Sequence, residues 1–107
     1  MRLRGRRAFA AVYDAKVRAS LGPLLVLSLP NDLGHPRLGL SVPRRVGSAV
    51  RRNHVKRLLR EAFRLSQHDW RRGFDILIIV RPHESLSLAE YQRLIVRANR
   101  SVEQRWG

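Results

Sequence analysis

Apolar residues in the middle of the chain recur at the spacing of an amphipathic helix. Five of them fall at i, i+3, i+4, i+7 and i+8, which places their side chains on one face at 3.6 residues per turn. Ser48 is suited to cap the amino end of this helix, which we expect to run to about Gln67. The apolar residues of its buried face are Val55, Leu58, Leu59, Ala62 and Phe63.

Two further helices are predicted near the ends of the chain. The first runs from Arg6 to about Ala19 and ends at Gly22-Pro23. The last starts at Ser87, which forms a capping-box pattern with Glu90. The residues at helical spacing are Phe9, Val12, Tyr13 and Lys16 in the first helix and Tyr91, Leu94, Ile95, Ala98 and Val102 in the last.

Three apolar runs of strand length are also present. The runs from Leu24 to Leu29 and from Arg37 to Val42 flank a turn-rich segment, so we expect two adjacent strands that form a hairpin. The run from Phe74 to Val80 is apolar without alternation, which is typical of a central strand covered on both faces. The element order α-β-β-α-β-α therefore predicts an α+β domain, with helices packed on a small mixed sheet.

Length and composition limit the class of protein. A chain of 107 residues forms one domain, so no second domain is available for a separate catalytic function. Lys and Arg number 22 against 8 Asp and Glu, giving a formal charge of +14, while 44% of residues are hydrophobic. These values indicate a folded cationic domain with an anionic partner. The absence of cysteine excludes disulfides and thiolate chemistry and favours the cytoplasm, and no apolar run is long enough to span a membrane.

A strip of polar side chains follows the exposed side of the central helix. Charged helical faces are most often simply solvated, but such faces normally mix signs. Glu61 is the only acidic residue between positions 44 and 64, and like charges four apart destabilise an isolated helix by about 0.2–0.5 kcal/mol per pair. An anionic partner would remove this penalty, so we predict that the helix docks on RNA. The strip consists of Arg52, Asn53, Lys56, Arg57, Arg60 and Arg64.

Three segments together are specific to one family. The helix motif Arg52-Asn53-x-x-Lys56-Arg57-x-x-Arg60 follows the strand from Arg37 to Val42 and the turn Val46-Gly47-Ser48-Ala49-Val50. With these segments the chain resembles the protein subunit of bacterial ribonuclease P. The resemblance extends from about Leu3 to Arg81, and over the last helix only the pattern agrees.

The resemblance implies a single ribonuclease P protein domain over residues 1–107, with a ribosomal-protein-S5-domain-2-like fold and a left-handed β-α-β crossover. It also implies a role beside a catalytic RNA, which removes the 5′ leader of precursor tRNA with Mg²⁺ bound mainly by RNA. No protein partner and no membrane is required, and a dimer of the holoenzyme is left open. The implied contacts to the catalytic RNA are Arg51, Arg52, Asn53, Lys56, Arg57, Arg60 and Arg64.

A second site is implied between the first helix and the outer face of the sheet, where the family holds the single-stranded leader. Phe9 and Tyr13 match its aromatic positions, and Lys16 and Arg18 could hold phosphates beside them. An aromatic ring stacks on an unpaired base without reading its identity. The alternative is that Phe9 and Tyr13, four residues apart, belong to the buried face of the helix.

The chain departs from the family pattern at two places. His54 stands where a basic residue usually follows the asparagine, so we expect a weaker or pH-dependent RNA contact there. The segment from Leu24 to Leu29 has no aromatic residue, which predicts shallower leader stacking.

Two other functions are compatible with parts of the sequence. A ribosomal or ribosome-assembly protein would bind RNA without turnover. A free-standing nuclease would need paired acid and base groups, but no spacing forces any two of the four histidines together. The same spacing gives no support for a catalytic side chain or a metal bound by protein ligands alone.

Overall fold

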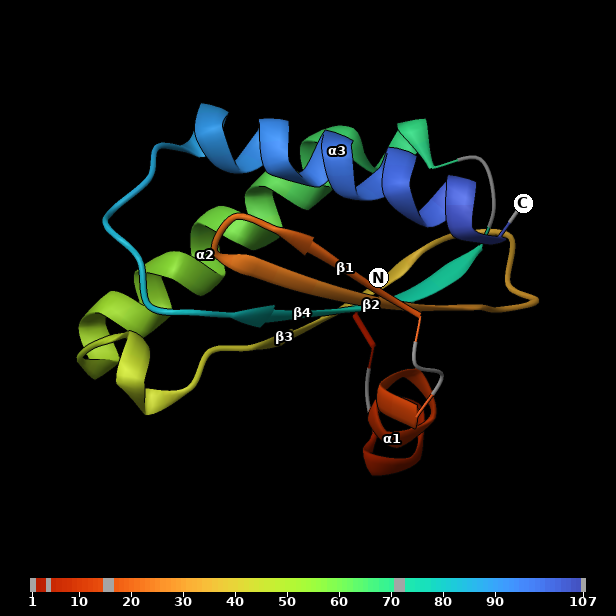
Figure 1. Ribbon diagram of the computed structural model, residues 1–107, viewed down its shortest axis with the longest axis horizontal. Coiled ribbons are helices and arrows are strands. Elements are labelled where there is room, and N and C mark those ends of the chain that lie inside the picture. The colour runs from red at the N-terminus through yellow and green to blue at the C-terminus, as the bar shows by residue number, and fades with distance from the viewer. Residues whose placement is uncertain (1, 4, 15–16, 71–72, 107) are drawn as a thin grey trace.

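A four-stranded mixed sheet separates two layers of helices in the computed structural model, which describes residues 2–3, 5–14, 17–70 and 73–106. Figure 1 shows α2 and α3 side by side over one face of the sheet and α1 against the other. The α+β prediction is confirmed. The elements are α1 (Arg6–Asp14), β1 (Arg18–Leu21), β2 (Leu24–Pro30), β3 (Arg37–Ser41), α2 (Ala49–Ser66), β4 (Phe74–Val80) and α3 (Leu88–Trp106), with short 3₁₀ turns at Arg44–Val46 and Gln67–Asp69.

Strand β4 lies inside the sheet, whose order is β1-β2-β4-β3. It pairs antiparallel with β2 and parallel with β3, and six of its seven residues are buried. The prediction of a central strand covered on both faces is therefore confirmed. Because successive side chains point to opposite faces, Ile76 and Ile78 enter the core beneath α2 and α3, whereas Leu77 enters a smaller core beneath α1.

The predicted hairpin between the second and third strands is wrong. β2 and β3 do not pair, because β4 lies between them and β3 reaches it through the parallel crossover that contains α2. The segment between β2 and β3 is instead fixed by contacts to the start of β4: the Asn31 amide nitrogen donates to the Gly73 carbonyl at 3.0 Å. Pairing between strands distant in sequence outweighed the local turn signal.

The first helix ends earlier than predicted, at Asp14, and Arg18–Leu21 forms an edge strand paired with β2. Leu21 pairs with Leu24, so Gly22 and Pro23 form the two-residue loop of a hairpin. Gly22 has a φ of 58°, the left-handed region that the first central residue of such a loop requires. A glycine-proline pair that indicated a helix end is thus a hairpin turn.

The two long helices begin where their capping residues predict. The Ser48 hydroxyl accepts a hydrogen bond from the Arg51 amide at 3.2 Å. Ser87 accepts from the Glu90 amide at 3.1 Å, and the Glu90 carboxylate accepts from the Ser87 amide at 3.3 Å, which completes the capping box.

Across the described ranges, no helix has the length and apolar composition needed to cross a bilayer.

A partly buried ion pair joins two residues, Arg37 and Asp75, that face each other in the register of β3 and β4. Arg37 donates two hydrogen bonds to the Asp75 carboxylate, at 2.7 and 2.6 Å, and the Asn31 side chain donates a third at 2.8 Å. Burial by itself raises the pKa of Asp75, but these hydrogen bonds and the Arg37 charge outweigh it and leave that pKa below its usual value. The network ties the β2–β3 segment to β4 and to the edge strand β3.

We expect Asp75→Asn to lower the free energy of unfolding by about 2 kcal/mol, because it removes the counter-charge of the Arg37 guanidinium, which is partly exposed to water. Urea denaturation measures the change, with Asp32→Asn at an exposed position as the control. Since the folded pKa is lowered, this stabilisation is present above about pH 4 and is lost as the pH falls through the folded value. An Asp75→Asn protein as stable as the control would contradict the assignment.

Candidate nucleic-acid interface

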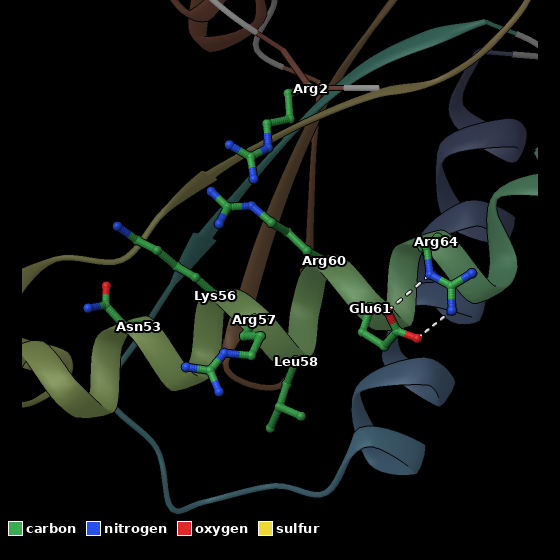
Figure 2. Close-up of a pocket in the computed structure, with 8 residues that line it drawn as sticks. All are labelled: Arg2, Asn53, Lys56, Arg57, Leu58, Arg60, Glu61 and Arg64. Atoms are coloured by element: carbon green, nitrogen blue, oxygen red, sulfur yellow. Dashed lines mark hydrogen bonds and ion pairs between the residues drawn. The ribbon is translucent and has the colours of Figure 1, made fainter.

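The basic stripe, defined as Arg52, Asn53, Lys56, Arg57, Arg60 and Arg64, lies on the side of α2 turned away from the core. Four of its members are exposed, and Arg52 and Lys56 are half-buried. Val55, Leu59, Ala62 and Phe63 on the opposite side are buried, as the periodicity predicts. A shallow surface pocket follows the stripe (Figure 2); its lining residues are Arg2, Asn53, Lys56, Arg57, Leu58, Arg60, Glu61 and Arg64.

Most cations of the stripe lack a partner among the residues that the structure describes. Lys56, Arg57 and Arg60 make no hydrogen bond or ion pair with any described residue. Arg64 is held by Glu61 through hydrogen bonds of 3.0 and 2.5 Å, and this contact lowers the pKa of the Glu61 carboxyl. The one acidic residue in this part of the sequence therefore neutralises the carboxy-terminal end of the stripe and leaves its middle positive.

Arg60 has a second cation beside it that sequence analysis did not identify. Figure 2 shows the guanidinium groups of Arg2 and Arg60 extended toward each other. Burial, and next the positive charge of Arg2, lower the pKa of Arg60 from its ordinary value. Residue 2 reaches this position because it bridges to Leu38 at the edge of the sheet, a pairing for which the local sequence carries no pattern.

Arg51, which the family resemblance places among the RNA contacts, is half-buried, and its guanidinium is engaged within the protein. Its guanidinium donates to the Val46 carbonyl at 3.2 Å, to the Ser85 hydroxyl at 2.7 Å and to the His83 carbonyl. It also packs on Gly47, where an added Cβ would lie 2.6 Å from the Arg51 Cδ. The side chain holds the amino end of α2 to the segment between β4 and α3.

That segment is anchored in turn to the core. The His83 ring lies within hydrogen-bond distance of the Arg81 carbonyl, at 2.7 Å, and of the Tyr91 hydroxyl, at 2.6 Å. Tyr91 is 1% exposed, and burial raises the pKa of its hydroxyl. Arg51 thus connects the start of the stripe to a buried residue of α3.

We expect Arg51→Ala to lower the free energy of unfolding by about 2 kcal/mol, because it removes several hydrogen bonds made by a charged group. Arg57→Ala removes an exposed arginine of the same helix and should change it by less than about 0.5 kcal/mol. Thermal or urea denaturation of the two variants makes the comparison. Equal stability would mean that Arg51 does not hold α2.

The α1 cleft is a pocket of about 420 Å³ on the opposite face of the sheet. Tyr13 is 51% exposed, Phe9 is half-buried, and Val12 between them is fully buried. The helix-core interpretation therefore holds for Val12 and in part for Phe9, which packs on the small core, but not for Tyr13. The cleft is lined by Arg6, Phe9, Ala10, Tyr13, Asp14, Ser41, Leu77 and Ile79.

Of the two basic residues predicted beside this cleft, Lys16 lies outside the described residues. Arg18 begins β1, and its guanidinium carbon lies 5.4 Å from the centroid of the Tyr13 ring, within cation–π range. Arg18 was predicted on a helix, but it reaches Tyr13 from a strand. The contact holds a positive charge against one side of an exposed aromatic ring.

Two of the four histidines line the same pocket, although no spacing in the sequence forces them together. His35 and His68 line it with Gln67 and Trp70, but no lysine or carboxylate is among its lining residues. His54 is exposed on α2. Among the residues that the structure describes, no three histidine or acidic side chains gather where they could hold a metal ion.

Comparison with known proteins gives consistent matches. A family model described as Ribonuclease P matches residues 1–104. The ribonuclease P protein component of Photobacterium profundum is 40% identical over 96 residues, covering 89% of this chain and 81% of that protein. That of Syntrophus aciditrophicus is 38% identical over 84 residues, covering 78% and 71%.

The solved structures that resemble this fold are of the same kind of protein as its sequence relatives. A solved structure of the RNase P protein from Thermotoga maritima matches with a TM-score of 0.82 at 32% identity, covering 91% of this chain and 95% of that one. With a match along nearly the whole chain, this chain belongs to the ribonuclease P protein family, the protein component of a ribonucleoprotein enzyme in which RNA carries out the catalysis.

Proposed function

We propose that the protein binds the catalytic RNA of ribonuclease P through the basic stripe of α2, and the 5′ leader of precursor tRNA through the α1 cleft. The observation that carries this proposal is the run of three unpartnered cations, Lys56, Arg57 and Arg60, along one exposed side of a helix. Phosphate oxygens supply the counter-charge that the described part of the protein does not. Arginine forks bind them bidentately, and lysine adds a compact charge.

The chemistry belongs to the RNA, and the stripe acts on it electrostatically. Arginine and lysine side chains offer no lone pair to Mg²⁺, which prefers oxygen ligands, and the Asn53 side chain offers at most one of the six ligands of an octahedral site. The metal is therefore held mainly by RNA. Positive side chains near the RNA reduce repulsion between phosphates, so the active RNA fold forms at a lower Mg²⁺ concentration.

The α1 cleft suits a single-stranded leader. Tyr13 offers an exposed ring for stacking on a base, and Arg18 beside it supplies a charge for a neighbouring phosphate. Leu77 and Ile79 form an apolar floor with no strand aromatic. Stacking on α1 alone accepts leaders of different sequence.

The protein works in the cytoplasm with ribonuclease P RNA and precursor tRNA, and the RNA complex can form a dimer without another protein.

The decisive test is cleavage of precursor tRNA at low Mg²⁺ by a bacterial ribonuclease P RNA, with and without this protein, beside a protein-only control. Stimulation in the mixture alone is the expected result. A folded protein that leaves the RNA unstimulated would favour a ribosomal or assembly role. Cleavage by the protein alone would favour a nuclease.

Salt dependence distinguishes residues that contact phosphates from those that hold the fold. If Arg60 neutralises a phosphate, Arg60→Ala should flatten the slope of log K against log salt by about 0.7–0.9. Arg51→Ala, measured where the variant is folded, should leave the slope unchanged because its donors are engaged within the protein. An unchanged slope for Arg60→Ala would remove that residue from the interface.

For the leader site, Tyr13→Ala should weaken binding of precursor tRNA to the holoenzyme by about 1–3 kcal/mol through loss of stacking. Binding of mature tRNA, which lacks the leader, should be unaffected. Tyr13→Phe keeps the ring and should retain affinity. Equal loss for both tRNAs would make Tyr13 a general RNA contact or a structural residue.

A further inference from the structure

The N-terminal segment before α1 places a cation, Arg2, beside α2. The Leu3 amide donates to the Leu38 carbonyl at 2.9 Å, and Arg2 bridges to Leu38 in a parallel arrangement beside β3. Leu3 is 3% exposed and lies in the small core beneath α1. Because neighbouring side chains of an extended segment point to opposite faces, burial of Leu3 directs Arg2 to the α2 side.

On that side, Arg2 and Arg60 share two adjoining pockets. Both residues line the pocket along the basic stripe and a second pocket of about 160 Å³, also lined by Arg64 and Gln67. Leu38 and Phe63, which are 6% and 4% exposed, contribute its apolar lining. This volume exceeds that of one water molecule several-fold, so the smaller pocket has room for a compact ion.

The charges around this pocket are not balanced by the described residues. Arg2 and Arg60 have no acidic partner among them, and Arg2 disfavours the charged form of Arg60. Glu61 lines the neighbouring pocket, but its two carboxylate oxygens accept hydrogen bonds from Arg64. Two like charges facing each other across a pocket are stabilised by an anion that accepts hydrogen bonds from both.

We infer that Arg2 and Arg60 form a phosphate clamp, in which one phosphate group is held between guanidinium groups supplied by the N-terminal segment and by α2. The phosphate can come from an RNA backbone or from a free ion, and its RNA source rests on the function proposed above. The clamp adds to the stripe a contact from a segment far away in sequence. It also makes the docking of residues 2 and 3 on β3 depend on the bound anion.

Inorganic phosphate tests the clamp without RNA. Thermal denaturation of the full chain is followed as phosphate replaces chloride at constant ionic strength, for the wild type, Arg2→Ala, Arg60→Ala and the double variant. Each single variant should bind phosphate about tenfold more weakly, as expected for loss of a charged hydrogen bond. The double variant should lose little more, because either deletion opens the same clamp.

Arg97→Ala is the matched control, since it removes an exposed arginine from the solvent side of α3. It should respond to phosphate like the wild type. A wild-type response in both single variants, an equal loss in Arg97→Ala, or independent and additive losses in the double variant would each overturn the clamp. Arg60→Lys, which keeps the charge, should retain part of the response.

A second experiment, with RNA, distinguishes a backbone phosphate from a free phosphate ion. With ribonuclease P RNA, Arg2→Ala should flatten the salt slope by about 0.7–0.9 if the clamp holds a backbone phosphate. A phosphate response that Arg2→Ala abolishes, together with an unchanged RNA slope, would support a clamp for free anions and overturn its RNA source. If phosphate binds at the clamp and the protein fails to stimulate cleavage, the proposed function fails while the clamp stands.

Discussion

The burial of β4 on both faces is the constraint on which the rest of the structure depends. Its apolar side chains need a cover on each side, and the sheet obtains one from α2 and α3 and the other from α1 (Figure 1). The same division separates the two candidate sites, because the basic stripe is on α2 and the cleft lies under α1. The Arg37–Asp75 pair fixes β3 beside this strand and thereby fixes where the crossover through α2 begins.

The protein carries many positive charges, and their mutual repulsion opposes folding. The chain has a formal charge of +14, and the described residues form only two ion pairs, Arg37 with Asp75 and Arg64 with Glu61. One of these fixes the sheet and the other lies at the end of the stripe. Repulsion among the remaining cations weakens the compact state, and a polyanion relieves it. We therefore expect RNA binding to stabilise the folded protein.

The sequence predicted the elements whose formation depends on residues close together in the chain. The spacing of Val55, Leu59 and Phe63, the cap at Ser48 and the capping box at Ser87 located both long helices, because their periodicity and end signals lie within a few residues. The hairpin error arose because the pairing of β2 and β3 depends on β4, which is distant in sequence. The β1 strand was missed for a different reason, since four residues of alternation are too short to outweigh a helical pattern.

For the site, the motif located the stripe, but sequence could not separate adjacent arginines. Arg51 and Arg52 differ only in which way the helix turns them, and Arg51 meets a segment more than thirty positions away. Arg2 was missed because its position depends on a bridge to Leu38. Tyr13 could be told from a core residue only when its exposure was known.

The sheet is expected to keep the catalytic RNA and the leader on different surfaces of the protein. Because the natural chain has no cysteine, single cysteines at Ala10, His54 and Arg97 can each carry a photo-crosslinker in the assembled holoenzyme with precursor tRNA. Ala10 lines the α1 cleft, His54 lies on α2, and Arg97 serves as the control on α3. We predict crosslinks from position 10 to the 5′ leader, from position 54 to the catalytic RNA, and from position 97 to neither. Leader crosslinks from position 54, or crosslinks from position 10 to the catalytic RNA alone, would contradict this separation.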